Sequence, residues 1–214
     1  MNIVSKISST KKLGSYNIYL NDSYSFTISD YTLSKFKISL NQKIEEVGIY
    51  EILICELAER LKNKLLIFLS IRPRSKKEMI QKMNLILSQY TKKWPILTTL
   101  DTSKIFEEGK QKTLEFLEKY NYVNDEIFAK YILDQRINQG KGPNFIKQDF
   151  FKFGIEPTLS KDILKSGDFK NSYSKSLLKA EKKYRGEKDL RKRKQKIIRY
   201  LISRGFQINF EEFE

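Results

Sequence analysis

Hydrophobic and polar residues alternate along the first 30 positions of the chain. Apolar or aromatic side chains stand at every second position on either side of an Asn-Asp-Ser turn, at Tyr16, Ile18, Leu20, Tyr24, Phe26 and Ile28. A period of two predicts strands, so we expect a β-hairpin here, with Ile3 to Ile7 fitting a third strand. Because so small a sheet is not stable alone, it should pack on the helical part of the chain or on a partner.

The pattern changes at Ile44 to a spacing of three or four residues, which predicts helix. The apolar positions from Tyr50 to Leu69 fit one long amphipathic helix, or two in sequence, that ends before Pro73. Ser75 and Glu78 then have the spacing of a capping box, which marks the start of the next helix.

Asparagine, glycine and proline delimit further helices in the second half of the chain. These are expected from Asn124 or Asp125 to Gly140, from Pro143 to Gly154, from Thr158 to near Gly167, around Tyr173 to Tyr184, and around Ile197 to Ile202. Gly154 is expected to close its helix at the position after the C-cap, and Gly140 and Gly142 are expected to give a flexible turn.

A helix that ends in glycine recurs along the chain. Lys141, Ile146, Phe150, Gly154 and Ile155 lie 51 residues before Lys192, Ile197, Leu201, Gly205 and Phe206. A fainter copy places Arg74, Met79 and Met83 67 residues before Lys141, Ile146 and Phe150, with Leu87 where the later copies have glycine. The alternative is chance similarity among lysine-rich helices, but the shared basic residue and terminal glycine favour true repeats.

The predicted fold is therefore mostly α-helical, with tandem three-helix repeats in an elongated curved array and a small N-terminal β-hairpin or three-stranded sheet. We divide the chain into a β-rich extension at 1–43, a first helical repeat at 44–120, a second three-helix repeat at 121–168 and a third repeat at 169–214. An insert near 84–110 lengthens the first repeat, and its Trp94-Pro95 pair cannot lie inside a regular helix.

The charge of the chain indicates which class of function to expect. The chain has 41 Lys and Arg against 26 Asp and Glu, a formal net charge of +15, which attracts polyanions. The alternative is a generic basic protein that uses its charge for solubility. The chain has no histidine and a single cysteine, Cys55, which we expect to be a buried core thiol in a reducing cytosol.

Candidate binding residues stand at the N-terminal side of the middle helix of each repeat. They are Arg72, Arg74, Lys76 and Lys77, then Arg136 and Lys141, then Arg191, Lys192, Arg193 and Lys194. Free backbone N–H groups and the helix dipole favour anions there, so added cations predict sites for phosphate or carboxylate. Solvated lysine-rich helix faces are the alternative. Tyr173, Tyr184 and Tyr200 could stack on bases, but a place in the core is the favoured interpretation.

The sequence does not indicate an enzyme. We find no carboxylate cluster for a metal, and the Gly140-Lys141-Gly142-Pro143 run lacks the spacing and the terminal Lys-Ser or Lys-Thr of a nucleotide-binding loop. No catalytic residue, metal or cofactor is therefore expected. No apolar stretch follows a basic start and none is long enough to span a membrane, so a cytoplasmic protein without a membrane partner is expected.

From about Leu65 onward, the chain resembles the RecX family of bacterial regulators of the RecA recombinase. The stretches that carry this resemblance are Leu69 with RPRS at Arg72 to Ser75 and Glu78, NDEIFAKYILDQRINQGKGPNFI at Asn124 to Ile146, FKFGI at Phe151 to Ile155, and KIIRYLISRGF at Lys196 to Phe206. The N-terminal hairpin is similar to the strand-containing extension of some members. The insert near 84–110 and Leu87 depart from the pattern of the family and leave the contacts of the first repeat open.

The resemblance implies a modular protein that lies along the groove of the RecA filament on single-stranded DNA and usually restrains filament growth and strand exchange. On this interpretation Arg72, Arg74, Arg136 and Lys141 face the filament, and single- or double-stranded DNA is a further candidate partner. A monomer without enzymatic activity is expected. The alternative is a sequence-nonspecific DNA-binding or transcriptional protein of helix-turn-helix type, whose basic second helices would enter a major groove.

Overall fold

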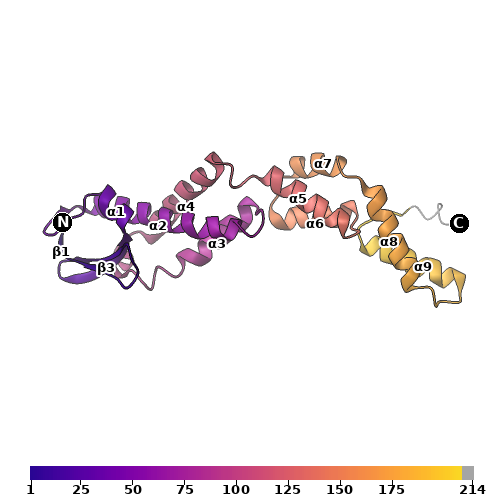
Figure 1. Cartoon of the computed structure of the whole chain (residues 1–214), viewed down its shortest axis with the longest axis horizontal. Coiled ribbons are helices and arrows are strands. Elements are labelled where there is room, and N and C mark those ends of the chain that lie inside the picture. The colour runs from indigo at the N-terminus through magenta and orange to yellow at the C-terminus, as the bar shows by residue number, and fades with distance from the viewer. Residues whose placement is uncertain (209–214) are drawn as a thin grey trace. The chain divides into compact units, whose positions relative to one another are not determined.

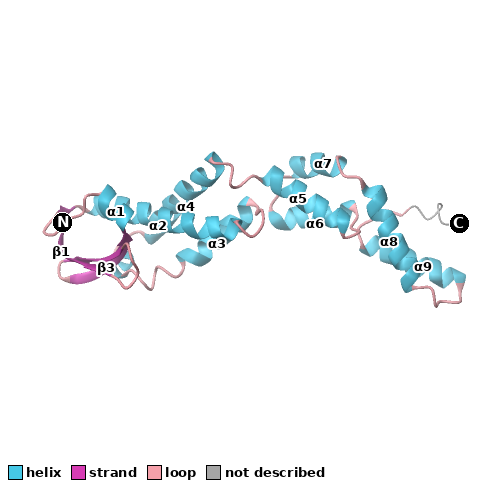
Figure 2. Ribbon diagram, viewed as in Figure 1, coloured by secondary structure: helices cyan, strands magenta, loops and turns pink. Residues whose placement is uncertain are grey.

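The computed structural model describes residues 1–208 (Figure 1). Most of these residues are helical, and the strands are confined to the N-terminal region (Figure 2). The chain folds into two compact units: the N-terminal unit comprises Met1–Arg72 and Met79–Tyr122, and the C-terminal unit comprises Pro73–Glu78 and Val123–Glu214. The predicted class, mostly α-helical with a small N-terminal sheet, is confirmed. The four-part division of the chain stays a prediction.

The sheet of the N-terminal unit is antiparallel and has the strand order β3-β2-β1-β4. Its strands are β1 (Asn2–Ser9), β2 (Ser15–Leu20), β3 (Ser23–Ser29) and β4 (Lys43–Ile44). The predicted hairpin is β2–β3, whose turn residues Asn21 and Asp22 both have positive φ, a conformation that asparagine and aspartate tolerate. The expectation of at most three strands was wrong, because the two residues of β4 are too few to show an alternation.

The helical part of the N-terminal unit is built around one long helix. The helices are α1 (Asp30–Lys35), α2 (Glu46–Leu69), most of α3 (Lys76–Leu87), the 3-10 helix η1 (Pro95–Thr98) and α4 (Thr102–Lys119). The choice between one long helix and two is thus settled in favour of one, α2. Helix α4 packs along α2, and Gly109 of α4 lies against Leu57, where a Cβ would make an ordinary van der Waals contact at 3.5 Å.

The predicted insert contributes to the core. The chain leaves α3, turns, and buries Trp94 just before Pro95 begins η1, which confirms that this pair lies outside a regular helix. The Trp94 ring meets Phe26 of β3 edge to face, with 6.5 Å between ring centroids. The sheet therefore packs on the helical part of its own unit, as expected from its small size.

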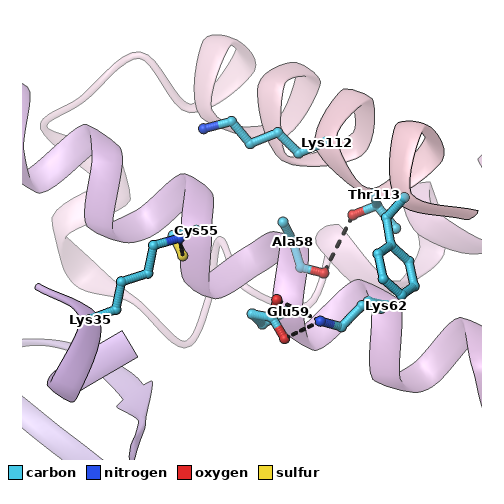
Figure 3. Close-up of a pocket in the computed structure, with 8 residues that line it drawn as sticks. Lys35, Cys55, Ala58, Glu59, Lys62, Lys112 and Thr113 are labelled. Atoms are coloured by element: carbon cyan, nitrogen blue, oxygen red, sulfur yellow. Dashed lines mark hydrogen bonds and ion pairs between the residues drawn. The ribbon is translucent and has the colours of Figure 1, made fainter. Parts of the chain in front are cut away.

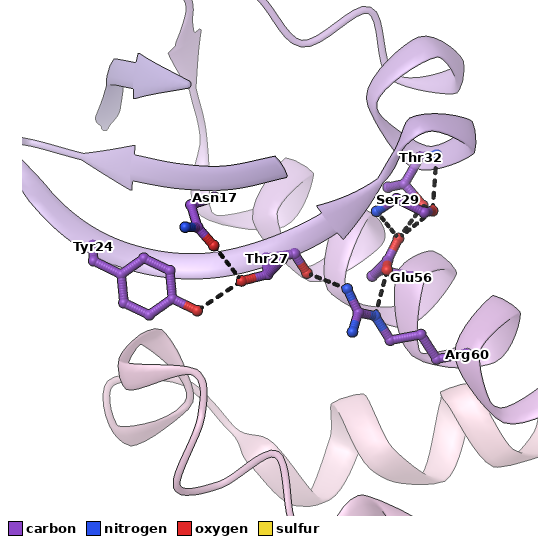
Figure 4. Close-up of polar contacts among 7 residues, drawn as sticks. All are labelled: Asn17, Tyr24, Thr27, Ser29, Thr32, Glu56 and Arg60. Atoms are coloured by element: carbon purple, nitrogen blue, oxygen red, sulfur yellow. Dashed lines mark hydrogen bonds and ion pairs between the residues drawn. The ribbon is translucent and has the colours of Figure 1, made fainter. Parts of the chain in front are cut away.

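A buried carboxylate joins α2 to the sheet (Figure 4). Glu56 is fully buried, and its Oε2 accepts hydrogen bonds from the backbone N–H of Ser29, the Ser29 hydroxyl and the Thr32 hydroxyl at 2.9, 2.7 and 2.5 Å. Its Oε1 accepts from Nε of Arg60 at 2.5 Å. Arg60 also donates to the Thr27 carbonyl at 3.0 Å, so this ion pair holds the end of β3 and the start of α1 against α2.

All regular secondary structure among the described residues of the C-terminal unit is helical. Its helices are α5 (Asp125–Asn138), α6 (Pro143–Phe153), α7 (Pro157–Lys165), α8 (Phe169–Lys183) and α9 (Leu190–Ser203). Phe128 of α5 with Ile146 and Phe150 of α6 centres one core, and Ala180 of α8 with Leu201 of α9 centres another. The second predicted repeat thus has three helices, and the third has two within residues 169–208.

Single residues define the helix ends as expected. Asn124 caps α5 with its side chain, Pro143 is the first residue of α6, and Gly154 ends α6 in the left-handed region at φ +76°. One start was wrong: α7 begins at Pro157, because the Glu156 carboxylate accepts hydrogen bonds from the N–H groups of Thr158 and Leu159 and thus caps the helix.

Two further sequence predictions concern buried side chains. Tyr173, Tyr184 and Tyr200 pack, half-buried, against the α8–α9 core, which confirms the core interpretation over base stacking. Cys55 is buried, as expected. No helix among residues 1–208 is long and apolar enough to cross a membrane.

Ser75 and Glu78 form the predicted capping box. The Ser75 hydroxyl accepts from the N–H of Glu78, and the Glu78 carboxylate accepts from the N–H of Ser75, both at 3.2 Å. Replacing Ser75 with alanine is expected to lower the free energy of unfolding by about 1 kcal/mol, because the N–H of Glu78 loses its acceptor, the hydroxyl of the buried Ser75. Urea unfolding followed by circular dichroism measures this. Ser174→Ala, an exposed position within α8, serves as the control and should change stability by less than about 0.5 kcal/mol.

Candidate polyanion-binding residues

The loop between α5 and α6 is bound to the end of α9 through backbone groups. The N–H of Gly142 donates to the Arg204 carbonyl at 2.8 Å, and the N–H of Asn144 donates to the Gly205 carbonyl at 3.1 Å. From α8, the Ser172 hydroxyl donates to the Lys141 carbonyl at 2.8 Å. The predicted second and third repeats are therefore joined here. We call the contact of residues 141–145, which lead into and begin α6, with Arg204 and Gly205, which follow α9, the α6–α9 joint.

Two glycines allow the α6–α9 joint to close. A Cβ on Gly205 would lie 2.3 Å from the backbone nitrogen of Phe145, and a Cβ on Gly142 would lie 2.6 Å from the carbonyl carbon of Gly205. Gly205 also has φ +90°, which other residues rarely adopt. The expectation of a flexible turn at Gly142 was wrong: the missing side chain serves the close approach of two backbones, which are then fixed by hydrogen bonds.

The joint gathers three cationic side chains, Arg136, Lys141 and Arg204. Burial lowers the pKa of Lys141 from its usual value, and the positive charges of Arg204 and Arg136 lower it further. The Lys141 ammonium lies over the Phe145 ring, 3.6 Å from the ring centroid. Arg204 donates to the Tyr200 hydroxyl at 2.7 Å. Arg204 was not among the binding residues predicted from the sequence, although it belongs to the RGF turn that carries part of the family resemblance.

The Arg136 guanidinium makes hydrogen bonds within the protein. Its Nε donates to the nearly buried Asp149 carboxylate of α6 at 2.6 Å, and its Nη1 donates to the Gln139 side chain at 3.0 Å. The first contact neutralises part of the charge, so Lys141 and Arg204 supply most of the positive field at the joint. A partner-binding role for Arg136 stays a prediction.

The first basic segment lies at the start of α3. Lys76 and Lys77 are exposed, whereas the Arg74 guanidinium is half-buried and pairs with Glu78 at 3.3 Å. The aliphatic stem of Lys77 covers Gly154, where a Cβ would lie 2.8 Å from Cδ of the lysine. Arg72, half-buried, is the last residue of the first stretch of the N-terminal unit.

The contact of Gly154 with Lys77 resembles the α6–α9 joint in the placement of its glycine. In both places, the glycine that ends one middle helix lies against the first turn of the preceding middle helix: Gly154 against Lys77, and Gly205 against Phe145. This shared placement of the glycine supports the interpretation of the internal similarity as structural repeats.

The third basic segment is the first turn of α9. Arg191, Lys192 and Lys194 are exposed and Arg193 is half-exposed. The Asp189 carboxylate caps the helix by accepting from the N–H of Lys192 at 3.1 Å, and it lies 3.8 Å from Nζ of Lys192.

Some backbone N–H groups at the helix starts already have acceptors within the protein. The backbone N–H groups at the helix starts were expected to be open to anions, but those of Lys76 and Lys192 donate to Asp125 and Asp189, and that of Asn144 donates to Gly205. These engaged N–H groups are not open to an anion, so we expect the side chains of the basic residues to make most of the contacts with one. No group of three potential metal-ligating side chains occurs in the part of the chain that the structure describes.

A small pocket of about 200 Å³ lies in the N-terminal unit (Figure 3). Lys35, Lys62 and Lys112 surround it, and the Lys35 ammonium donates to Sγ of Cys55 at 3.3 Å. This hydrogen bond raises the pKa of Lys35 above its usual value. Lys62 pairs with Glu59 at 2.5 Å. The three lysines give the pocket a positive charge, and the buried Cys55 thiol accepts a hydrogen bond from Lys35.

Comparisons with known proteins identify similar chains. A family model described as "RecX, third three-helix domain" matches residues 179–209. Regulatory protein RecX of Clostridioides difficile is 27% identical over 229 residues that cover all of both chains, and that of Bacillus subtilis is 27% identical over 98% of this chain and 74% of its own.

Two solved structures are also similar. A crystal structure of regulatory protein RecX has a TM-score of 0.63 at 25% identity and covers 97% of this chain and 95% of its own. RecX from Lactobacillus salivarius has a TM-score of 0.56 at 25% identity over 72% of this chain and 90% of its own. The similarity thus extends over the sheet and the helical units.

Proposed function

Because the chain belongs to the RecX family of regulatory proteins, we propose that it regulates the RecA recombinase by binding RecA filaments on single-stranded DNA and restraining their activity in recombination and repair. Such a partner would place the chain in the cytoplasm, and the repeats would bind it as a monomer. The four segments 1–43, 44–120, 121–168 and 169–214 would act as successive modules along the filament.

The observation that carries this proposal is the cluster of Arg136, Lys141 and Arg204 at the α6–α9 joint. Like charges held together raise the free energy of the unbound protein, and a polyanion that neutralises them recovers that energy on binding. The cluster is formed by backbone contacts between two repeats, so it is present before a partner arrives. A preformed cluster loses little conformational entropy on binding.

The remaining predicted residues extend this surface. Lys76, Lys77, Arg191, Lys192 and Lys194 are exposed at the starts of α3 and α9, and they would contact phosphates or the acidic side chains of the filament. Arg72, Arg74, Arg136 and Arg193 are half-buried and would contribute through their guanidinium groups.

Replacing Arg72, Arg74 and Lys141 together with alanine is expected to raise the dissociation constant for RecA filaments on single-stranded DNA at least about tenfold, because each lost charge removes a favourable contact with a polyanion. Filament binding by fluorescence anisotropy at fixed salt measures this.

The matched control removes three positive charges from the exposed surface of α8, in the variant Lys170→Ala, Lys179→Ala, Lys182→Ala. The two triple variants have the same net charge, so an equal loss of affinity in both would mean that only total charge matters and would contradict the assignment of these residues. Unchanged filament binding in the first variant would contradict it as well.

A further inference from the structure

A groove of about 590 Å³ lies between α6 and α7 of the C-terminal unit, apart from the α6–α9 joint. It is lined by the apolar residues Phe151, Ile155, Pro157 and Leu164, by Ser160, and by the lysines Lys147, Lys161 and Lys165. This volume lies within the range of sites that bind small molecules or a few side chains of a peptide.

Phe151 leaves a large apolar surface open to solvent. Its side chain is 82% exposed, whereas its neighbour Phe150 is fully buried in the core of the unit. Since Phe150 and Ile146 already fill the core-facing side of α6, Phe151 contributes little to the fold. Aromatic side chains beside an apolar groove are typical anchors of protein–protein contacts.

The charge of the groove indicates which kind of partner segment it can bind. Three of its eight lining residues are lysines, from both helices, and none is acidic. The nearby Glu156 carboxylate caps α7, and Asp162 makes a 3.4 Å contact with Lys165 in which both side chains are exposed, so this pair is weak. An apolar floor with a cationic rim complements a segment that carries both apolar and acidic side chains.

A second pair of helices shows that this chemistry does not follow from helix packing alone. The groove between α3 and α4 of the N-terminal unit is lined mostly by polar residues and includes an acid, with Asn84, Ser88, Thr91, Ser103, Glu107 and Lys110 beside Leu87 and Phe106. A groove between α2 and α3 also combines apolar residues with lysines, Ile67, Phe68, Ile71 and Ile86 with Lys64 and Lys82, but its volume is only about 340 Å³.

We propose that the α6–α7 groove docks an acidic segment of a partner protein. The apolar side chains of the segment pack on Phe151 and Leu164, and its carboxylates pair with Lys147, Lys161 and Lys165. The segment would bind as a helix whose apolar side chains, three or four residues apart, enter the groove. The inference goes beyond the proposed function, because it concerns a protein segment and does not depend on the basic residues of the α6–α9 joint.

The test is fluorescence anisotropy with the full chain and a panel of labelled synthetic peptides, in which Phe, Leu or Trp anchors lie four positions apart among glutamates. Phe151→Ala is expected to raise the dissociation constant about tenfold, as loss of an aromatic anchor does. The double variant Lys147→Glu, Lys161→Glu should weaken binding to a similar extent, and more at low salt. Peptides with lysine in place of glutamate should not bind.

Matched controls are Leu178→Ala and Lys179→Glu, which alter an exposed apolar residue and an exposed lysine of α8 and should change the dissociation constant less than about twofold. Absence of binding by every acidic peptide would overturn the proposal, and so would equal losses in the control variants. A single-stranded oligonucleotide that binds with the same dependence on Phe151 and displaces the peptide would also overturn it, because the groove would then be a nucleic-acid surface.

Discussion

Replacing Glu56 with alanine is expected to lower the free energy of unfolding of the N-terminal unit by about 4 kcal/mol. The substitution removes the acceptor of three hydrogen bonds from Ser29 and Thr32 and leaves the Arg60 guanidinium without its carboxylate. Burial acts to lower the pKa of Arg60, but the Glu56 carboxylate raises it, and the net shift is upward. The positive charge of Arg60 is thus stabilised by Glu56, and removing the carboxylate leaves that charge without compensation.

Trp94 gives a direct readout of this change. It is the only tryptophan of the chain, it is buried in the N-terminal unit, and the Arg60 guanidinium lies 5.5 Å from its ring centroid. Urea unfolding followed by Trp94 fluorescence should show the loss. Glu51→Ala, at an exposed position of the same helix, should change stability by less than about 0.5 kcal/mol. A Glu56→Ala protein as stable as this control would show that the buried carboxylate does not hold the sheet.

Replacing Gly205 with alanine is expected to lower the free energy of unfolding of the C-terminal unit by about 3 kcal/mol, from strain at positive φ and the loss of two backbone hydrogen bonds. The new Cβ would lie 2.3 Å from the backbone nitrogen of Phe145. Since no side-chain rotation relieves a clash with backbone, the two segments must separate and break the hydrogen bonds of Gly142 and Asn144. Gly142→Ala should act in the same way.

The chain offers a matched control in Gly186, where a Cβ would meet nothing within 4 Å. Gly186→Ala should leave stability within about 0.5 kcal/mol of the parent. Urea unfolding followed by circular dichroism compares the variants. Because Lys141 and Arg204 are held together by this joint, Gly205→Ala should also weaken polyanion binding under conditions in which the protein stays folded. Equal stability of the Gly205 and Gly186 variants would contradict the description of the joint.

Local signals in the sequence were enough to find most helix ends. The capping box at Ser75, the first-turn proline at Pro143 and the left-handed glycine at Gly154 each depend on the stereochemistry of one or two residues, and the structure has all three. The same reasoning missed β4, because two residues show no periodicity. It also missed the start of α7, where a glutamate acts as the cap.

Contacts between distant segments could not be predicted in this way. In the sequence Glu56 is one of several charged residues that interrupt an apolar stretch, yet its partners Ser29 and Thr32 lie 27 and 24 residues away and bury it completely. The residues of the candidate site could be predicted only in part, for the same reason. Composition and spacing identified Arg136 and Lys141, but the third member of their cluster, Arg204, joins them only through the backbone contacts of Gly142 and Gly205.

The most direct test of the proposed function is a comparison of the affinity of the unaltered chain for RecA filaments on single-stranded DNA with its affinity for the same DNA without RecA, over a series of salt concentrations. We predict tight filament binding, weak binding to naked single- and double-stranded DNA, and a shallower salt dependence for the filament. Equal affinity for naked DNA, falling steeply with salt and indifferent to RecA, would contradict the account and identify a general nucleic-acid-binding protein.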